Sequence, residues 1–177
     1  AQRRRLGKRI DDALLNVVDH GGYILGPEVR ELESRLAEFA DAAHCVTCAN
    51  GTDALGLVLM AWEIGEGDAV FVPDFTFVAT AEVVAWLGAT PVFVDVDEST
   101  FNMDPDELER AIDDATRRGL RPKAVIPVDL FGQPADYRRL TPIVERHAMR
   151  MLCDAAQGFG ATLDGRRTGG LSLIHIS

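Results

Sequence analysis

One aspartate stands where a buried strand would stop. Residues 149–153 read as a short, mostly apolar strand, and Asp154 follows directly, with two alanines, Gln157 and Gly158 after it. The ligand site of an open parallel α/β sheet lies beyond the carboxyl ends of its strands. A carboxylate buried there needs a cationic partner, because burying an unpaired charge is costly. A protonated pyridine nitrogen would be such a partner; the alternative is that Asp154 only caps the next turn.

A second candidate site is a turn between an expected strand and an expected helix. Residues 45–49 are predicted to form the strand, residues 50–53 the turn, and the helix runs from residue 54 to about residue 64. The free N–H groups at a helix N-terminus suit a phosphate, and Thr52 could add a hydroxyl donor. Alternatively, Thr52 or Asp53 simply caps the helix. The motif matches neither a Walker loop nor a G-x-G-x-x-G fingerprint.

Two cysteines, Cys45 and Cys48, have a spacing that is typical of redox and zinc sites. A zinc site needs about four ligands, and the sequence holds no second pair. On a strand, residues three apart also point to opposite faces. We therefore interpret the two cysteines as small buried residues and predict no metal site.

The elements that must position these residues alternate between helix and strand. Apolar residues at helical spacing predict a first helix that ends near His20 and a second that opens at Gly26-Pro27. Strands are then expected over residues 69–73, 91–96, 123–128 and 149–154, and helices over residues 75–87, from residue 104 onward, and over residues 136–147. This alternation predicts an α/β fold with a doubly wound, largely parallel sheet flanked by helices. Phe77 falls in the first turn of its helix, where its ring could stack on a planar cofactor or belong to the core.

Composition limits the function classes. A chain of 177 residues with 47% apolar residues is long enough for one domain with a sizeable core. Its net charge of −10 disfavours nucleic-acid and anionic membrane surfaces. The most apolar region, residues 75–96, is interrupted by Glu82, Gly88 and Pro91, so we expect no membrane span. Neither a signal peptide nor a disulfide framework is indicated, and a cytoplasmic location is predicted.

Six short stretches, in order, carry a resemblance to a known family. They are GYILGPEV at 22–29, NGTDAL at 50–55, PDFTFVAT at 73–80, GATPVFVDV at 88–96, FGQPAD at 131–136 and DAAQ at 154–157. Together they resemble the DegT/StrS sugar aminotransferases, which bind pyridoxal 5′-phosphate (PLP) on the fold-type I aminotransferase scaffold. The resemblance covers nearly the whole chain up to Gly170. Each motif is common alone, whereas six in family order are highly specific.

The resemblance implies cofactor contacts for six residues. The PLP phosphate would be held by Gly51, Thr52 and Asp53, the pyridine ring would stack on Phe77, the pyridinium nitrogen would pair with Asp154, and the region of the ring hydroxyl would bond to Gln157. A carboxylate at the ring nitrogen keeps it protonated and makes the ring an electron sink. The implied reaction moves an amino group, usually from glutamate, onto a nucleotide-linked keto-sugar. The implied assembly is a homodimer with a site built from both subunits.

The lysines depart from the family pattern. PLP chemistry needs a lysine amine, and this sequence has only Lys8 and Lys123. Lys8 belongs to the first helix, and Lys123 begins its strand, roughly 17–20 Å from the carboxyl end. The family's lysine follows the DAAQ motif by a few dozen residues, so we expect it beyond Ser177. We assign no catalytic residue and expect the 177 residues alone to be inactive.

The end of the sequence allows two interpretations. Residues 1–170 are predicted to be the N-terminal part of an incomplete PLP-binding large domain, with the small C-terminal domain absent. Residues 171–177 resemble translated sequencing adaptor, so we predict a non-native tail on a truncated reading frame. The alternative is a real terminal strand, since Leu-Ile-His-Ile has strand propensity. Alternative functions are a PLP-fold sugar dehydratase, with histidine in place of the lysine, or a non-enzymatic ligand-binding regulator of the same fold.

Overall fold

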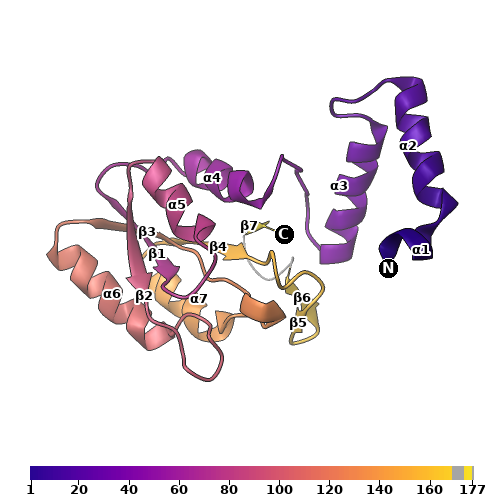
Figure 1. The fold of residues 1–177 in the computed structure, drawn as a ribbon. Helices are drawn as coiled ribbons and strands as arrows, with labels where there is room; N and C mark the ends of the chain where they lie inside the picture. The colour runs from indigo at the N-terminus through magenta and orange to yellow at the C-terminus, as the bar shows by residue number, and fades with distance from the viewer. Residues whose placement is uncertain (169–173, 177) are drawn as a thin grey trace. The chain divides into compact units, whose positions relative to one another are not determined.

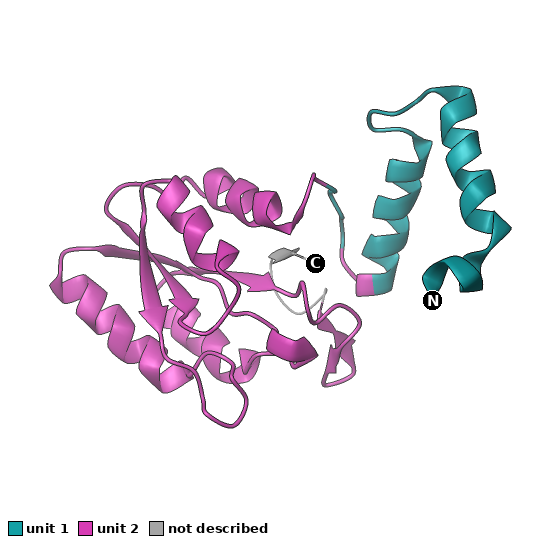
Figure 2. Ribbon diagram, viewed as in Figure 1, with its two compact units in different colours: residues 1–39, 43–47 teal, residues 40–42, 48–177 magenta. Residues whose placement is uncertain are grey.

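The structure is a computed structural model and describes residues 1–168 and 174–176 (Figure 1). It divides into two compact units, one of residues 1–39 and 43–47 and the other of residues 40–42 and 48–177 (Figure 2). Among the described residues, no helix has the length and apolar character that crossing a membrane requires.

The first unit is helical. It contains α1 (Gln2–Leu6) and α2 (Lys8–His20), and α3 (Pro27–Ala40) begins there. One helix was predicted up to His20, but Gly7, at φ +54°, separates α1 from α2. The end of α2 is as predicted, because Gly21 adopts the left-handed conformation and its N–H bonds the carbonyl of Val17. Proline at the first position of α3 has the fixed φ that a helix start requires.

The second unit is built on a parallel sheet. In the described part of the chain, five strands lie in the order β2-β1-β3-β4-β7, and each neighbouring pair is parallel. Their bounds are β1 Asp68–Pro73, β2 Thr90–Val94, β3 Arg121–Val125, β4 Arg150–Asp154 and β7 Ile174–Ile176. A short antiparallel pair, β5 (Thr162–Leu163) and β6 (Arg166–Arg167), follows β4.

Helices cover both faces of this sheet (Figure 1). Val70 and Val72 of β1 pack in one buried cluster with residues of α4 (Gly51–Ala61) and α5 (Ala79–Trp86). Ala69 and Phe71 pack in the other with residues of α6 (Pro105–Arg117) and α7 (Tyr137–Arg146). Alternate residues of a strand point to opposite faces, so β1 is buried along its whole length. The predicted doubly wound arrangement is confirmed.

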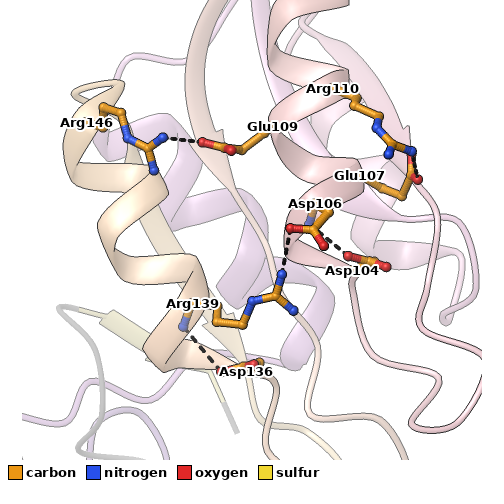
Figure 3. A network of polar contacts seen from close by, with 8 residues as sticks. All are labelled: Asp104, Asp106, Glu107, Glu109, Arg110, Asp136, Arg139 and Arg146. Atoms are coloured by element: carbon orange, nitrogen blue, oxygen red, sulfur yellow. Dashed lines mark hydrogen bonds and ion pairs between the residues drawn. The ribbon is translucent and has the colours of Figure 1, made fainter.

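Exposed ion pairs join α6 to α7 (Figure 3). Arg139 bonds Asp106 at 2.6 Å, and Arg146 pairs with Glu109. Asp104 caps α6 through the N–H of Asp106 at 2.8 Å. Solvent-exposed pairs of this kind each contribute about 0–1 kcal/mol, so the buried face between the helices and the sheet carries most of the stability. We therefore interpret these charged residues as structural and assign them no role in a binding site.

Several predicted elements differ from the observed ones. Residues 45–49 form no strand, because a strand needs a ladder partner and no described strand pairs with them. Cys45 is half-buried and Cys48 is exposed, so the interpretation of both as buried was wrong. The helix expected from residue 75 begins at Ala79. The strands expected to reach residues 96 and 128 are shorter, and Val128 retains a single parallel bridge to Asp154.

The proposed tail falls partly outside the described residues. Residues 171–173 and Ser177 are among those the structure does not describe, whereas residues 174–176 form β7 beside β4. The division at residue 170, and the non-native origin of residues 171–177, stay predictions.

Candidate functional site

Asp154 ends β4 at the carboxyl edge of the sheet, as expected. The residue is 8% exposed, and Oδ1 accepts a hydrogen bond from the N–H of Ala156 at 3.1 Å. Its main chain is held at both ends, because its N–H donates to Pro127 at 3.0 Å and its carbonyl accepts from Asp129 at 2.9 Å. One oxygen therefore caps the turn, as in the simpler alternative. Oδ2 accepts no hydrogen bond of normal geometry from any described residue.

The surroundings of Asp154 disfavour its charge. Burial raises the pKa of the Asp154 carboxyl, and the Ala156 N–H and the Thr80 hydroxyl lower it by less. No lysine or arginine is among the groups that act on this pKa. A cation brought by a ligand would supply the missing compensation.

A helix N-terminus supplies donors for an anion. Asn50 caps α4, since its Oδ1 accepts from the Asp53 N–H at 2.9 Å and its Nδ2 donates to Asp53 Oδ2 at 3.0 Å. The cap is thus neither Thr52 nor Asp53, the two residues expected from the sequence. The N–H groups of Gly51 and Thr52 have no acceptor among the described residues. Nothing lies within 4 Å of the Gly51 Cβ position, so the approach is open.

The same buried cluster joins this helix to β4. Leu55 of α4 and Leu152 of β4 belong to one core, and Leu152 is two residues before Asp154. The donors at the start of α4 and the carboxylate at the end of β4 are therefore carried by elements that pack together. The turn into α4 and the tip of β4 lie on the same side of the sheet (Figure 1).

Phe77 lies in the loop between β1 and α5, and not inside a helix as predicted. The residue is 67% exposed, which makes a purely structural role a poor explanation. Its carbonyl accepts from the N–H of Thr80 at 3.2 Å, and Thr80 is buried close enough to Asp154 to act on its pKa. The Phe77 loop therefore leads directly into the part of α5 that lies near the Asp154 carboxylate.

Gln157 is fixed by a main-chain contact. Its Oε1 accepts from the N–H of Phe131 at 2.7 Å. Its Nε2 donates to no described residue, so the amide has a free donor. Phe131 also belongs to a cluster with Phe75 and Phe101, whose ring centroids are 5.6, 6.2 and 6.5 Å apart. This cluster was not anticipated from the sequence.

Three buried side-chain oxygens in this region lack a partner. Among the described residues, they are Thr76 Oγ1, Thr80 Oγ1 and Asp129 Oδ2. Thr80 Oγ1 is near enough to Asp154 to lower the pKa of that carboxyl, but the two groups make no hydrogen bond of normal geometry. Buried polar groups in native proteins are nearly always hydrogen-bonded, so such atoms need an explanation. Thr76 lies in the Phe77 loop, Thr80 lies in the first turn of α5, and Asp129 is bonded through its main chain to Asp154. Asp129 was missed as a site residue, although it follows a predicted strand just as Asp154 does.

Lys123 does not reach this site in the described structure. Ala124 pairs with Arg150, so Lys123 is level with Met149, five residues before Asp154 and about 16 Å from it along the strands. Lys123 was expected to begin its strand, but it is the third residue of β3; its distance from the carboxyl edge is close to the expected one. Lys8 lies in the helical unit.

The residues fit PLP. Open donors at a helix N-terminus suit its phosphate, a buried uncompensated carboxylate suits its ring nitrogen, and an exposed ring suits its flat face. The small residues Ala155 and Ala156, with Gly158, follow the carboxylate where the ring needs room. The individual contacts of Gly51, Thr52, Asp53, Phe77, Asp154 and Gln157 stay predictions.

Comparison with known proteins identifies the family of this chain. A family model described as the DegT/DnrJ/EryC1/StrS aminotransferase family matches residues 4–177. The chain is 50% identical over 173 residues to a UDP-2-acetamido-2-deoxy-3-oxo-D-glucuronate aminotransferase of Pseudomonas aeruginosa, covering 98% of this chain and 46% of that protein.

Solved structures match the fold. A DegT DnrJ EryC1 StrS aminotransferase from Brucella abortus has a TM-score of 0.93 and 52% identity over 95% of this chain and 45% of that one. A putative sugar aminotransferase from Streptococcus pneumoniae, solved in a PLP form, has a TM-score of 0.82 and 34% identity, covering 89% of this chain and 42% of that one. The expected fold class, the large domain of a PLP-dependent transferase, is confirmed. The chain spans less than half the length of these relatives.

Proposed function

Because the chain belongs to the DegT/DnrJ/EryC1/StrS aminotransferase family, we propose that the whole protein transfers an amino group from an amino acid to a nucleotide-linked keto-sugar. The donor in this proposal is glutamate, and the cofactor is PLP. The 50% identity to an aminotransferase that is named for a UDP-linked oxo-sugar supports the substrate class.

The observation that carries the proposal is the state of Asp154. It is a buried carboxylate at the carboxyl edge of a parallel sheet, with no cation among the described groups that act on it. Bound PLP would supply an electron-withdrawing ring that stabilises negative charge developing on the amino-acid carbon. Asp154 would hold a proton on the ring nitrogen, which strengthens that withdrawal.

The other residues bind and orient. The N–H groups of Gly51 and Thr52 would hold the phosphate, while Asp53 keeps Asn50 in its capping position. Phe77 would cover one face of the ring and exclude water from it. Gln157, fixed by Phe131, would donate its free amide N–H to the ring hydroxyl oxygen.

We propose that neither Lys8 nor Lys123 is the residue that attacks the aldehyde carbon of PLP. In this proposal that residue lies beyond residue 177, where the family lysine is expected. Lysine there would support the aminotransferase, and histidine would support the sugar dehydratase. Another residue would support the ligand-binding regulator.

Asp154→Asn in the full-length protein tests the proposal. The amide has the same shape and keeps an oxygen for the Ala156 N–H, but it cannot stabilise a ring cation. We expect the fold to be retained and most transamination to be lost. Asp164→Asn is the matched control, because Asp164 is exposed and pairs with Arg138. Normal turnover in Asp154→Asn would return Asp154 to its capping role.

A further inference from the structure

A second buried carboxyl group lies against Asp154. Asp129 is fully buried, and its N–H donates to the Asp154 carbonyl at 2.9 Å. Its Oδ1 accepts from the N–H of Ala135 at 3.0 Å and from the Tyr137 hydroxyl at 2.6 Å. Its Oδ2 is buried and has no partner among the described residues. The carboxyl group is therefore well bonded on one oxygen and unbonded on the other.

Asp129 also supports the turn that follows Asp154. A Cβ atom added at Gly158 would lie 2.6 Å from Asp129 Cβ and 2.8 Å from Asp129 Oδ2. The backbone at Gly158 thus packs directly on this side chain. Asp129 contacts the Asp154 turn at both ends, through a main-chain bond at Asp154 and a side-chain contact at Gly158.

The charges around Asp129 favour its neutral form. Burial raises the pKa of Asp129, the Tyr137 hydroxyl and the Ala135 N–H lower it, and the charge of Asp154 on β4 raises it again. Burial likewise raises the pKa of Tyr137, and Cys153 and Asp129 act in the same direction, so the Tyr137 hydroxyl keeps its proton and donates it. None of these groups is a cation. An ionised Asp129 would place a second buried anion beside Asp154.

We propose that Asp129 and Asp154 carry one negative charge between them, that this charge resides on Asp154, and that Asp129 is a neutral positioning residue with its proton on Oδ2. Oδ1 already accepts two hydrogen bonds, so Oδ2 is the free place for the proton. The neutral carboxyl holds the Asp154 turn without competing for a ligand cation. The value of this arrangement to catalysis rests on the proposed function, whereas the distribution of charge does not.

Infrared spectroscopy of the full-length protein tests the charge directly. A protonated carboxyl group has a carbonyl band that a carboxylate lacks. At neutral pH we expect this band in the wild type and in Asp154→Asn, and we expect its loss in Asp129→Asn. A wild-type spectrum without the band, or a band that persists in Asp129→Asn, would overturn the proposal.

Stability as a function of pH gives an independent measurement. A carboxyl group with a raised pKa in the folded state binds its proton more tightly when folded, so stability falls as pH rises from the unfolded value, about 3.9, through the folded value. Asp129→Asn has no such proton. Its melting temperature relative to the wild type should therefore increase from acid to neutral pH, and a difference that does not change with pH would contradict the proposal.

PLP affinity distinguishes a residue that only positions Asp154 from a residue whose charge pairs with the cofactor. Asparagine keeps the Oδ1 acceptor for Ala135 and Tyr137, so Asp129→Asn should bind PLP within about threefold of the wild type. Asp154→Asn should bind it at least about tenfold more weakly. Equal losses in the two variants would mean that Asp129 is also an anionic partner of the cofactor. If Asp154→Asn transaminates normally while the infrared and pH results hold, the proposed function fails and the charge assignment stands.

Discussion

Asn50 and Asp53 cap each other at the start of α4. The Asn50 amide accepts from the Asp53 N–H at 2.9 Å and donates to the Asp53 carboxylate at 3.0 Å. The capping amide thus orients the Asp53 carboxylate through a hydrogen bond, although the acid keeps its charge. It also leaves the N–H groups of Gly51 and Thr52 as the open donors. Asp53 would then contribute to phosphate binding by supporting the cap, and the direct contacts would come from its two predecessors.

Substitutions at Asn50 should separate stability from phosphate binding. Asn50→Ala removes the cap and should destabilise the full-length protein by about 1 kcal/mol, measured by urea unfolding of the cofactor-free form. Asn50→Asp restores a good cap but adds an anion where the phosphate would bind, so it should fold normally and bind PLP more weakly. Wild-type PLP affinity in Asn50→Asp would argue against a phosphate at this helix end.

Phe77 should matter for the cofactor and little for the fold. Its ring is mostly exposed, so Phe77→Ala should change the free energy of unfolding by less than about 0.5 kcal/mol. Loss of ring stacking should weaken PLP binding up to about tenfold, and Phe77→Tyr should restore it. Phe93→Ala is the matched control, because Phe93 is 58% exposed on the edge strand β2. Equal PLP affinity in the Phe77 and Phe93 variants would remove Phe77 from the site.

The sheet was predictable because local pattern and long-range pairing agree there. Residues 69–73 and 151–153 are apolar runs that stay buried, and their neighbours supply ladder partners. Residues 45–49 show the limit of this reasoning. Their β propensity is real, but a strand also requires a partner, and the described residues supply none. Propensity alone cannot reveal that condition.

The site was predictable where a residue follows a strand, and less so where contacts are non-local. Asp154 was found from its place after an apolar run. Asp129 occupies the same kind of position but ends in contact with Tyr137 and Gly158, and those contacts arise only from folding. The pairing of Gln157 with Phe131 is likewise a long-range contact. A rule that marks every polar residue after a buried strand would have included Asp129.

The full-length protein should be a homodimer. Among the described residues, the N–H groups of Gly51 and Thr52 at the proposed phosphate site have no acceptor, and a dianionic phosphate needs more donors than these two. A second subunit is our proposed source. Sedimentation should give the dimer mass with PLP bound, and a fully active monomer would contradict this assembly. Together with a cytoplasmic location, the dimer stays a prediction until it is measured.

The 177-residue chain should not form a covalent bond with PLP at its own site. It holds the residues proposed for the phosphate and the ring nitrogen, but Lys123 is about 16 Å from Asp154 along the strands. An amine at that distance cannot reach a carbonyl carbon that is positioned by Asp154 and the start of α4, so any binding should be weak and noncovalent.

Borohydride reduction of the purified chain with PLP, followed by peptide mass mapping, measures this. We expect only low, nonspecific labelling of Lys8 and Lys123. The control is a Lys123→Arg variant, in which the labelling of Lys8 gives the nonspecific level. We also expect no glutamate-dependent amination of a keto-sugar nucleotide. Stoichiometric labelling of either lysine, accompanied by that amination, would show that the nucleophile lies within these residues and that the site is not at the carboxyl edge of β4.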